Sequence, residues 1–120
     1  MSESLVFKTI FDNGWQDVTF EPFQTGVEIC WLTRGKPEVA LLRYEPGASV
    51  PKHRHTGMET ILVLEGSQSD ESGRYVRGTY IINPAGTEHS VWTEDGCLVL
   101  IQWEAPVAFL SQQESSAETQ

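Results

Sequence analysis

The sequence predicts an all-β protein that forms a single domain. Ten glycines and six prolines are spread along its 120 residues, a composition typical of a fold with short strands and many turns. The apolar residues of the first 24 positions are spaced in a way that favours short strands and loops over a long helix. A chain of this length is the size of one domain, which buries roughly two-thirds of the surface of its unfolded state.

The strands can be placed in order from the N-terminus. Residues 26–33 are predicted to form a strand, residues 34–37 a turn, and residues 38–44 the second strand of a hairpin. Arg43 shares a strand face with apolar neighbours. If that face is buried, the arginine needs an acidic partner or a substrate carboxylate, which is a weak indication of an anionic ligand. Further strands are expected at residues 61–64, 78–83, 88–93 and 97–103.

Two polar stretches are expected to lie outside the strands. Residues 68–74 are predicted to be a loop or a hairpin tip. Asp70 and Glu71 could act there as a general acid and base, but a solvated tip is the simpler interpretation. Residues 111–120 contain no apolar anchor and are expected to be a disordered tail.

Two apolar runs bear on assembly. Residues 60–64 and 98–101 are apolar on both strand faces, whereas the residues of a half-exposed strand alternate. Both faces must then be covered, either by the N-terminal strands or by a second subunit. We therefore expect a homodimer.

The candidate site lies in two short runs that together contain all three histidines of the chain. His53 and His55 are two residues apart, so that in a strand both imidazoles point to the same side. Glu59 follows a turn at Thr56-Gly57 and can bring a carboxylate back to the same point. His89 begins another strand after a turn of Pro and Gly residues. Three imidazoles and a carboxylate predict a site for one divalent metal ion. Glu59 could instead be the hydrogen-bond partner of a ligating imidazole.

These residues resemble the two motifs of the cupins. The first motif is Gly, five residues, His-x-His, three or four residues, Glu, six residues and Gly; it matches Gly47, His53, His55, Glu59 and Gly66. The second is Gly, five residues, Pro-x-Gly, two residues, His, three residues and Asn. It matches Gly78, Pro84, Gly86 and His89, with Thr93 in place of the Asn. The resemblance implies a double-stranded β-helix, the cupin jelly-roll barrel, with His53, His55, Glu59 and His89 as metal ligands.

A narrower resemblance covers residues 38–104, which are similar to the cupin-like domain of ChrR-type anti-sigma factors and to the small cupins of acetylacetone dioxygenases. It implies one cupin domain over residues 1–110, with N-terminal strands in residues 1–37 and the barrel in residues 38–104. It also supports a homodimer.

The composition excludes some functions. The net charge of −9 disfavours binding to nucleic acid and to anionic membranes, because no basic cluster offsets it. The N-terminus has no signal-peptide pattern and no apolar run could span a bilayer, so a cytoplasmic protein is expected. Cys30 and Cys97 are then expected to stay reduced.

Two functions remain open. The first is a metal-dependent enzyme with a small-molecule pocket, an oxidoreductase of the dioxygenase type. The second is a non-catalytic, zinc-dependent sensor or regulatory module of the ChrR type. Zinc and iron are the favoured ions, and nickel, manganese and copper also suit an imidazole-rich site. No catalytic residue can be named. Sigma-factor binding is not expected, because the separate helical, zinc-binding domain of the anti-sigma factors and its His-x-x-x-Cys-x-x-Cys run are not found in the sequence.

Overall fold

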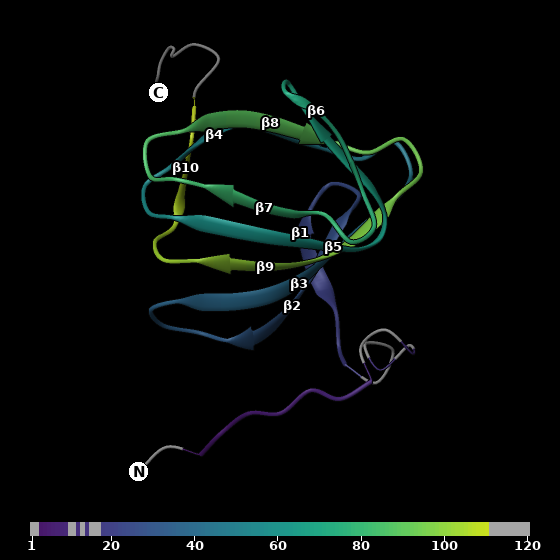
Figure 1. The fold of residues 1–120 in the computed structure, drawn as a ribbon, viewed down its shortest axis with the longest axis vertical. Coiled ribbons are helices and arrows are strands. Elements are labelled where there is room, and N and C mark those ends of the chain that lie inside the picture. The colour runs from purple at the N-terminus through teal and green to yellow at the C-terminus, as the bar shows by residue number, and fades with distance from the viewer. Residues whose placement is uncertain (1–2, 10–11, 13, 15–17, 111–120) are drawn as a thin grey trace.

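The computed structural model describes residues 3–9, 12, 14 and 18–110, and within these it contains ten β-strands and no α-helix (Figure 1). The prediction of an all-β fold is confirmed. The predicted tail at residues 111–120 lies outside the described residues. The strands are β1 Glu21–Gln24, β2 Val27–Thr33, β3 Glu38–Tyr44, β4 Ser49–His55, β5 Glu59–Asp70, β6 Gly73–Val76, β7 Tyr80–Asn83, β8 Glu88–Trp92, β9 Cys97–Trp103 and β10 Val107–Phe109.

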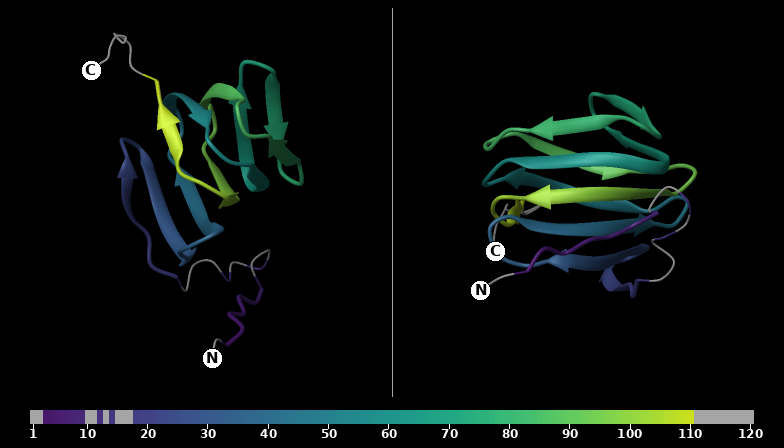
Figure 2. Two further views of the ribbon diagram at one scale, coloured as in Figure 1. Left: turned by 90° about the vertical axis from the view of Figure 1, so that its left-hand side faces the viewer. Right: turned by 60° about the horizontal axis from the view of Figure 1, so that its bottom comes forward.

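The strands form one sheet that curls on itself. Their order is β1-β2-β3-β9-β5-β8-β4-β10, and β6 and β7 also pair with β5. All of the pairings are antiparallel. The expected hairpin of residues 26–33 and 38–44 is present as β2 and β3. Figure 2 shows the two layers that the curl produces, with β4, β8 and β10 facing the layer of β2, β3 and β9.

Strand β5 joins the two layers. Its first half pairs with β9, and its second half pairs with β6 and, through Ser69, with β8. The register shifts between Val63 and Glu65, and a bulge of this kind bends a strand. Gly66 follows at a φ of 73°, and a Cβ at this position would lie 2.1 Å from the carbonyl oxygen of Gly96. Only glycine fits here, so the last Gly of the first motif has a structural reason.

The core lies between the two layers. It is made of buried side chains from β2, β3, β4, β5, β8 and β9, among them Val27, Ile29, Leu42, Ile61, Val63, Val91, Val99 and Ile101. This apolar packing holds the walls of the barrel together around its polar site.

A second cluster covers the outer face of the β3-β9-β5 layer. Cys30, Leu41, Leu64 and Leu98 are buried there, and Val18 and Phe20 pack against them. The N-terminal segment therefore covers part of the outer face of the apolar runs at residues 60–64 and 98–101. Both cysteines are buried and free, in agreement with their expected reduced state. The homodimer stays a prediction.

The boundaries differ from the prediction at residues 68–74. Strand β5 continues to Asp70, and β6 begins at Gly73, so that the turn contains only two residues. Asp70 is buried, and its interpretation as a solvated tip residue was wrong. Polar composition was misleading here because this part of β5 faces the polar interior of the barrel.

We expect Leu41→Ala to lower the free energy of unfolding by about 2–5 kcal/mol, because Leu41 is 1% exposed in the outer cluster. Ile82→Ala is the matched control, since Ile82 is 56% exposed, and it should cost less than about 1 kcal/mol. Urea denaturation of both variants measures the difference. Equal losses would show that the outer cluster is not a buried core.

Candidate metal centre

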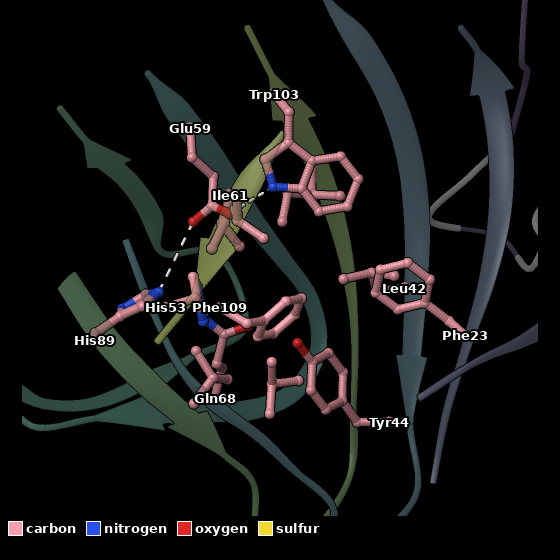
Figure 3. Close-up of a pocket in the computed structure, with 14 residues that line it drawn as sticks. Phe23, Leu42, Tyr44, His53, Glu59, Ile61, Gln68, His89, Trp103 and Phe109 are labelled. Atoms are coloured by element: carbon pink, nitrogen blue, oxygen red, sulfur yellow. Dashed lines mark hydrogen bonds and ion pairs between the residues drawn. The ribbon is translucent and has the colours of Figure 1, made fainter. Parts of the chain in front are cut away.

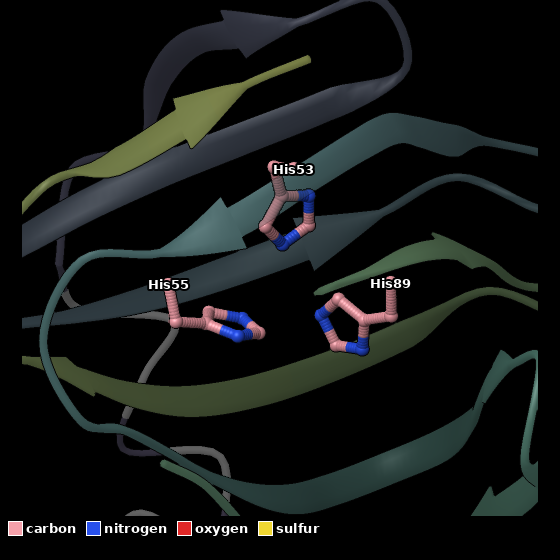
Figure 4. Close-up of side chains that lie close together, drawn as sticks. All are labelled: His53, His55 and His89. Atoms are coloured by element: carbon pink, nitrogen blue, oxygen red, sulfur yellow. The ribbon is translucent and has the colours of Figure 1, made fainter. Parts of the chain in front are cut away.

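The three histidines meet in the interior of the barrel (Figure 4). His53 and His55 lie on β4, and His89 lies on β8 directly opposite His53 in the antiparallel register. One nitrogen of each ring lies within 4.8 Å of the others, and all three side chains are buried. The sequence prediction that these residues lie together is confirmed.

The outward-facing nitrogen of each ring is held by a hydrogen-bond acceptor. Nδ1 of His53 lies 2.9 Å from the carbonyl oxygen of Pro51, which can only accept. Nδ1 of His89 lies 3.0 Å from Oδ2 of Asp70, whose carboxylate also accepts. Both rings must therefore carry a proton on Nδ1.

His55 reaches the same state through a hydroxyl group. Its Nδ1 lies 2.9 Å from Oγ1 of Thr87, and that hydroxyl donates its own proton to the carbonyl oxygen of Pro84 at 2.7 Å. Thr87 can therefore only accept from His55. All three imidazoles are then Nδ1–H tautomers when neutral, and each leaves the lone pair of Nε2 free for a ligand.

Glu59 adds a carboxylate to the ring of histidines. Its Oε1 lies 3.0 Å from Nε2 of His55 and 3.9 Å from Nε2 of His89. Neither Nε2 has a partner with hydrogen-bond geometry among the described residues. A lone pair that faces a carboxylate oxygen is repulsive, so this arrangement requires either a proton on Nε2 or a metal ion between the two groups. A metal ion meets that requirement, and the residues present therefore fit one.

The carboxylate of Glu59 is 2% exposed and is fixed by two further donors. Asn83 donates to Oε1 at 2.9 Å, and the indole of Trp103 donates to Oε2 at 2.6 Å. Burial alone raises the pKa of Glu59, but His55 and the two donors outweigh it and bring the pKa below its ordinary value. The group stays anionic, as a metal ligand or the partner of one must be.

The pKa values of the imidazoles respond to the same environment. Burial lowers the pKa of His53. Burial also acts to lower the pKa of His55, but the Glu59 carboxylate beside it brings the pKa above its ordinary value. These shifts widen the pH range in which His53 is neutral and the range in which His55 is protonated next to the carboxylate.

A small cavity opens beside His53 and His89 (Figure 3). Its volume is about 30 Å³, and its wall is mostly apolar, with Ile61, Trp103 and Phe109 among the residues that line it. Arg43 does not line this cavity. Its guanidinium bonds Glu28 at 2.7 Å and stacks on Phe20 on the other side of the sheet, so the indication of an anionic ligand is not supported.

The sequence did not reveal the residues that orient the ligands. Asp70, Thr87, Asn83 and Trp103 contact three of the four candidate ligands, namely His89, His55 and Glu59, and none was assigned to the site. Asn83 pairs with Glu59 in the register of β5 and β7, and Trp103 pairs with it in the register of β5 and β9. Strand pairing was the signal that could have found them, and it is not readable before the register is known.

The model of a family described as the ChrR cupin-like domain matches residues 13–106. The chain belongs to this family. The anti-sigma-E factor ChrR of Cereibacter sphaeroides is 35% identical over 99 residues, which make up 80% of this chain and 46% of that protein.

Solved structures agree with the family assignment. The crystal structure of Rhodobacter sphaeroides SigE in complex with the anti-sigma ChrR matches with a TM-score of 0.69 and 33% identity, over 73% of this chain and 50% of the matched chain. An acetylacetone dioxygenase from Acinetobacter johnsonii matches with a TM-score of 0.78 at 16% identity, over 94% of this chain and 81% of that one. The second likeness shows the cupin fold alone.

One prediction about partners was wrong. Sigma-factor binding was not expected, yet this ChrR cupin-like domain matches an anti-sigma factor and a structure of such a protein bound to SigE. The prediction relied on a helical domain being absent from the sequence. The chain spans about half the length of the ChrR proteins it matches, so that absence carries no weight.

The sequence predicts a cytoplasmic location. Within the described part of the chain, no helix has the length and hydrophobicity needed to span a membrane. The cytoplasmic location and the lack of a nucleic-acid partner stay predictions.

The tautomers can be observed directly. In zinc-loaded protein, long-range ¹H–¹⁵N spectra should show His53, His55 and His89 as Nδ1–H tautomers, because each Nδ1 faces an acceptor and the ion would occupy the Nε2 lone pairs. An Nε2–H signal from any of the three would contradict the proposed direction of its lone pair.

Asp70→Asn should weaken metal binding by about 10- to 100-fold, because the carboxylate that orients the ring of His89 is lost. Asp95→Asn is the matched control: the Asp95 side chain is 65% exposed and pairs with Arg74 at the surface. Competition with a chromophoric chelator measures both affinities. If the two variants bind metal equally well, Asp70 does not support the site.

Proposed function

We propose that this ChrR cupin-like domain is a non-catalytic regulatory module that binds one divalent metal ion through His53, His55, His89 and Glu59. The observation that carries the proposal is the common orientation of the three imidazoles. Each Nδ1 is committed to an acceptor, so that three Nε2 lone pairs converge beside a buried carboxylate. A surface cluster of histidines has no reason to be fixed in this way.

Zinc and iron are the ions that we propose for the site. Three imidazoles and one carboxylate suit both, and also nickel, manganese and copper. Ligand atoms around a tetrahedral zinc ion lie about 3.3 Å apart; the contacts of Glu59 at 3.0 Å and 3.9 Å are near this distance, whereas the imidazole nitrogens lie within a wider 4.8 Å of one another. When bound, the ion supplies a Lewis-acid centre, and the residues of the chain fix its position and limit the access of water.

We further propose that the partner of the module is a sigma factor. The support is the match to ChrR, one solved structure of which contains a bound SigE. On this proposal, residues 1–110 form the cupin domain and residues 38–104 its barrel, and the state of the metal site alters the surface that the partner contacts.

An enzyme of the dioxygenase type is the second candidate, and one observation favours it. The cavity is lined by His53, Glu59 and His89, so a small molecule in it would lie next to three of the four candidate ligands. Whereas the regulatory module needs only a bound ion or ligand, the enzyme needs turnover.

Protein purified without added metal should contain about one metal ion per chain by elemental analysis, and His89→Ala should lose most of it. The circular dichroism spectrum of the variant should stay that of a β-fold, because the apolar core does not include the site. If His89→Ala retains stoichiometric metal, the proposed site is wrong. A collapse of the fold would instead indicate an ion that is structural.

The same preparation separates the two candidates. Iron-loaded protein given acetylacetone should consume no more oxygen than the metal-free protein does. Sustained oxygen consumption that His89→Ala abolishes would establish the enzyme and overturn the regulatory proposal.

A further inference from the structure

Gln68 is a buried polar residue that the metal centre does not use. It lies on β5 two residues before Asp70, so both side chains point into the barrel. Its side chain is 1% exposed and lines the cavity together with His53 and His89 (Figure 3). Neither Nε2 nor Oε1 of its carboxamide has a hydrogen-bond partner among the described residues.

Apart from the Nε2 atoms of His55 and His89, which face the proposed ion, the buried polar side chains near Gln68 have partners; Thr93 and Asp70 are examples. The hydroxyl of Thr93 donates to the carbonyl oxygen of Ser67 at 2.6 Å. Asp70 accepts from the backbone of Ser72, from Tyr75 and from His89. Burying a carboxamide with both ends unpaired destabilises a protein, so such a group calls for a partner that completes it. The partner must supply a donor for Oε1 and an acceptor for Nε2.

The rest of the cavity restricts what that partner can be. Among the described residues, no Lys or Arg lines it, and the carboxylate of Glu59 is part of its wall. An anionic group away from the metal would therefore be unpaired and repelled. The hydroxyl of Tyr44 points into the same space (Figure 3), and because burial raises its pKa it remains an uncharged phenol.

The size of the cavity sets a further limit. About 30 Å³ is room for roughly two water molecules, or for a solute of a few non-hydrogen atoms. Water could form the missing hydrogen bonds of Gln68, but a solute with a donor and an acceptor side by side pairs with both Oε1 and Nε2 at once. The apolar wall formed by residues such as Ile61 and Val91 suits the carbon atoms of such a solute.

We propose that Gln68 is the recognition residue for a small uncharged ligand with a hydrogen-bond donor and acceptor in adjacent positions, the chemistry that primary amides and hydroxy ketones share. The ligand binds between the carboxamide of Gln68 and the metal centre. This inference rests on the proposed function, because the metal site forms one wall of the pocket. It names the class of molecule to which the regulatory module responds.

Three probes of nearly equal size test the inference. Acetamide is uncharged and has a donor and an acceptor, acetone lacks the donor, and acetate is charged. In ¹⁵N-labelled, zinc-loaded protein, acetamide should shift the side-chain NH₂ resonances of Gln68 and bind about tenfold or more tightly than acetone or acetate. Equal binding of the three probes, or no shift of these resonances, overturns the inference.

Gln68→Met keeps the length of the side chain but removes both polar ends. It should weaken acetamide binding about tenfold, raise the melting temperature and leave zinc content unchanged. Gln102→Met is the matched control, because Gln102 alternates with the cavity residues Ile101 and Trp103 and faces outward. It should leave acetamide binding as it is in the natural chain.

The outcomes for the role of Gln68 and for the metal site can be told apart. If Gln68→Met binds both zinc and acetamide as the natural chain does, the role of Gln68 is overturned and the metal site stands. If the natural chain takes up no zinc, the proposed function fails, and the same titrations in metal-free protein then decide the role of Gln68. A lower melting temperature for Gln68→Met would show that structural water already completes the carboxamide, and would overturn the inference.

Discussion

The antiparallel pairing of β4 with β8 is the constraint on which the site depends. It places His53 opposite His89, and the alternation along β4 adds His55 on the same face. A slip of one residue in this pairing would turn His89 away from the others. Pro51 lies where the register of β4 shifts, a position that tolerates a residue without an N–H group, and its carbonyl oxygen accepts from His53. The irregularity in the strand thus also orients a candidate ligand.

Strand β5 provides the other half of the site from a single continuous segment. Glu59 at its start lies beside the histidines, and Asp70 at its end accepts a hydrogen bond from Nδ1 of His89. Gln68 lines the cavity beside the metal centre. The bulge after Val63 and the tight approach at Gly66 let one strand serve both layers. The geometry of the site therefore depends on backbone features that hold no ligand themselves.

Much of this could be predicted from the sequence, because residue spacing encodes it. The two motifs located the three histidines and Glu59, and turn residues located the hairpin of β2 and β3. Asp70 could not be found in this way. It sits in a polar stretch that resembles an exposed loop, and only the curl of the sheet shows that the interior there is polar. For Arg43, apolar neighbours suggested an inward face and weakly indicated an anionic ligand, but its neighbour Leu41 belongs to the outer cluster.

The hydrogen bond from Trp103 to Glu59 places an indole at the edge of the candidate metal centre. Indole fluorescence depends strongly on the charge that its N–H group faces. A cation that draws electron density from the Glu59 carboxylate weakens that bond, and the excited state of Trp103 changes with it. Trp31, whose ring centre lies 5.9 Å from that of Trp103, is close enough to exchange excitation energy with it. A cation bound beside Glu59 would therefore change the part of the tryptophan emission that comes from Trp103.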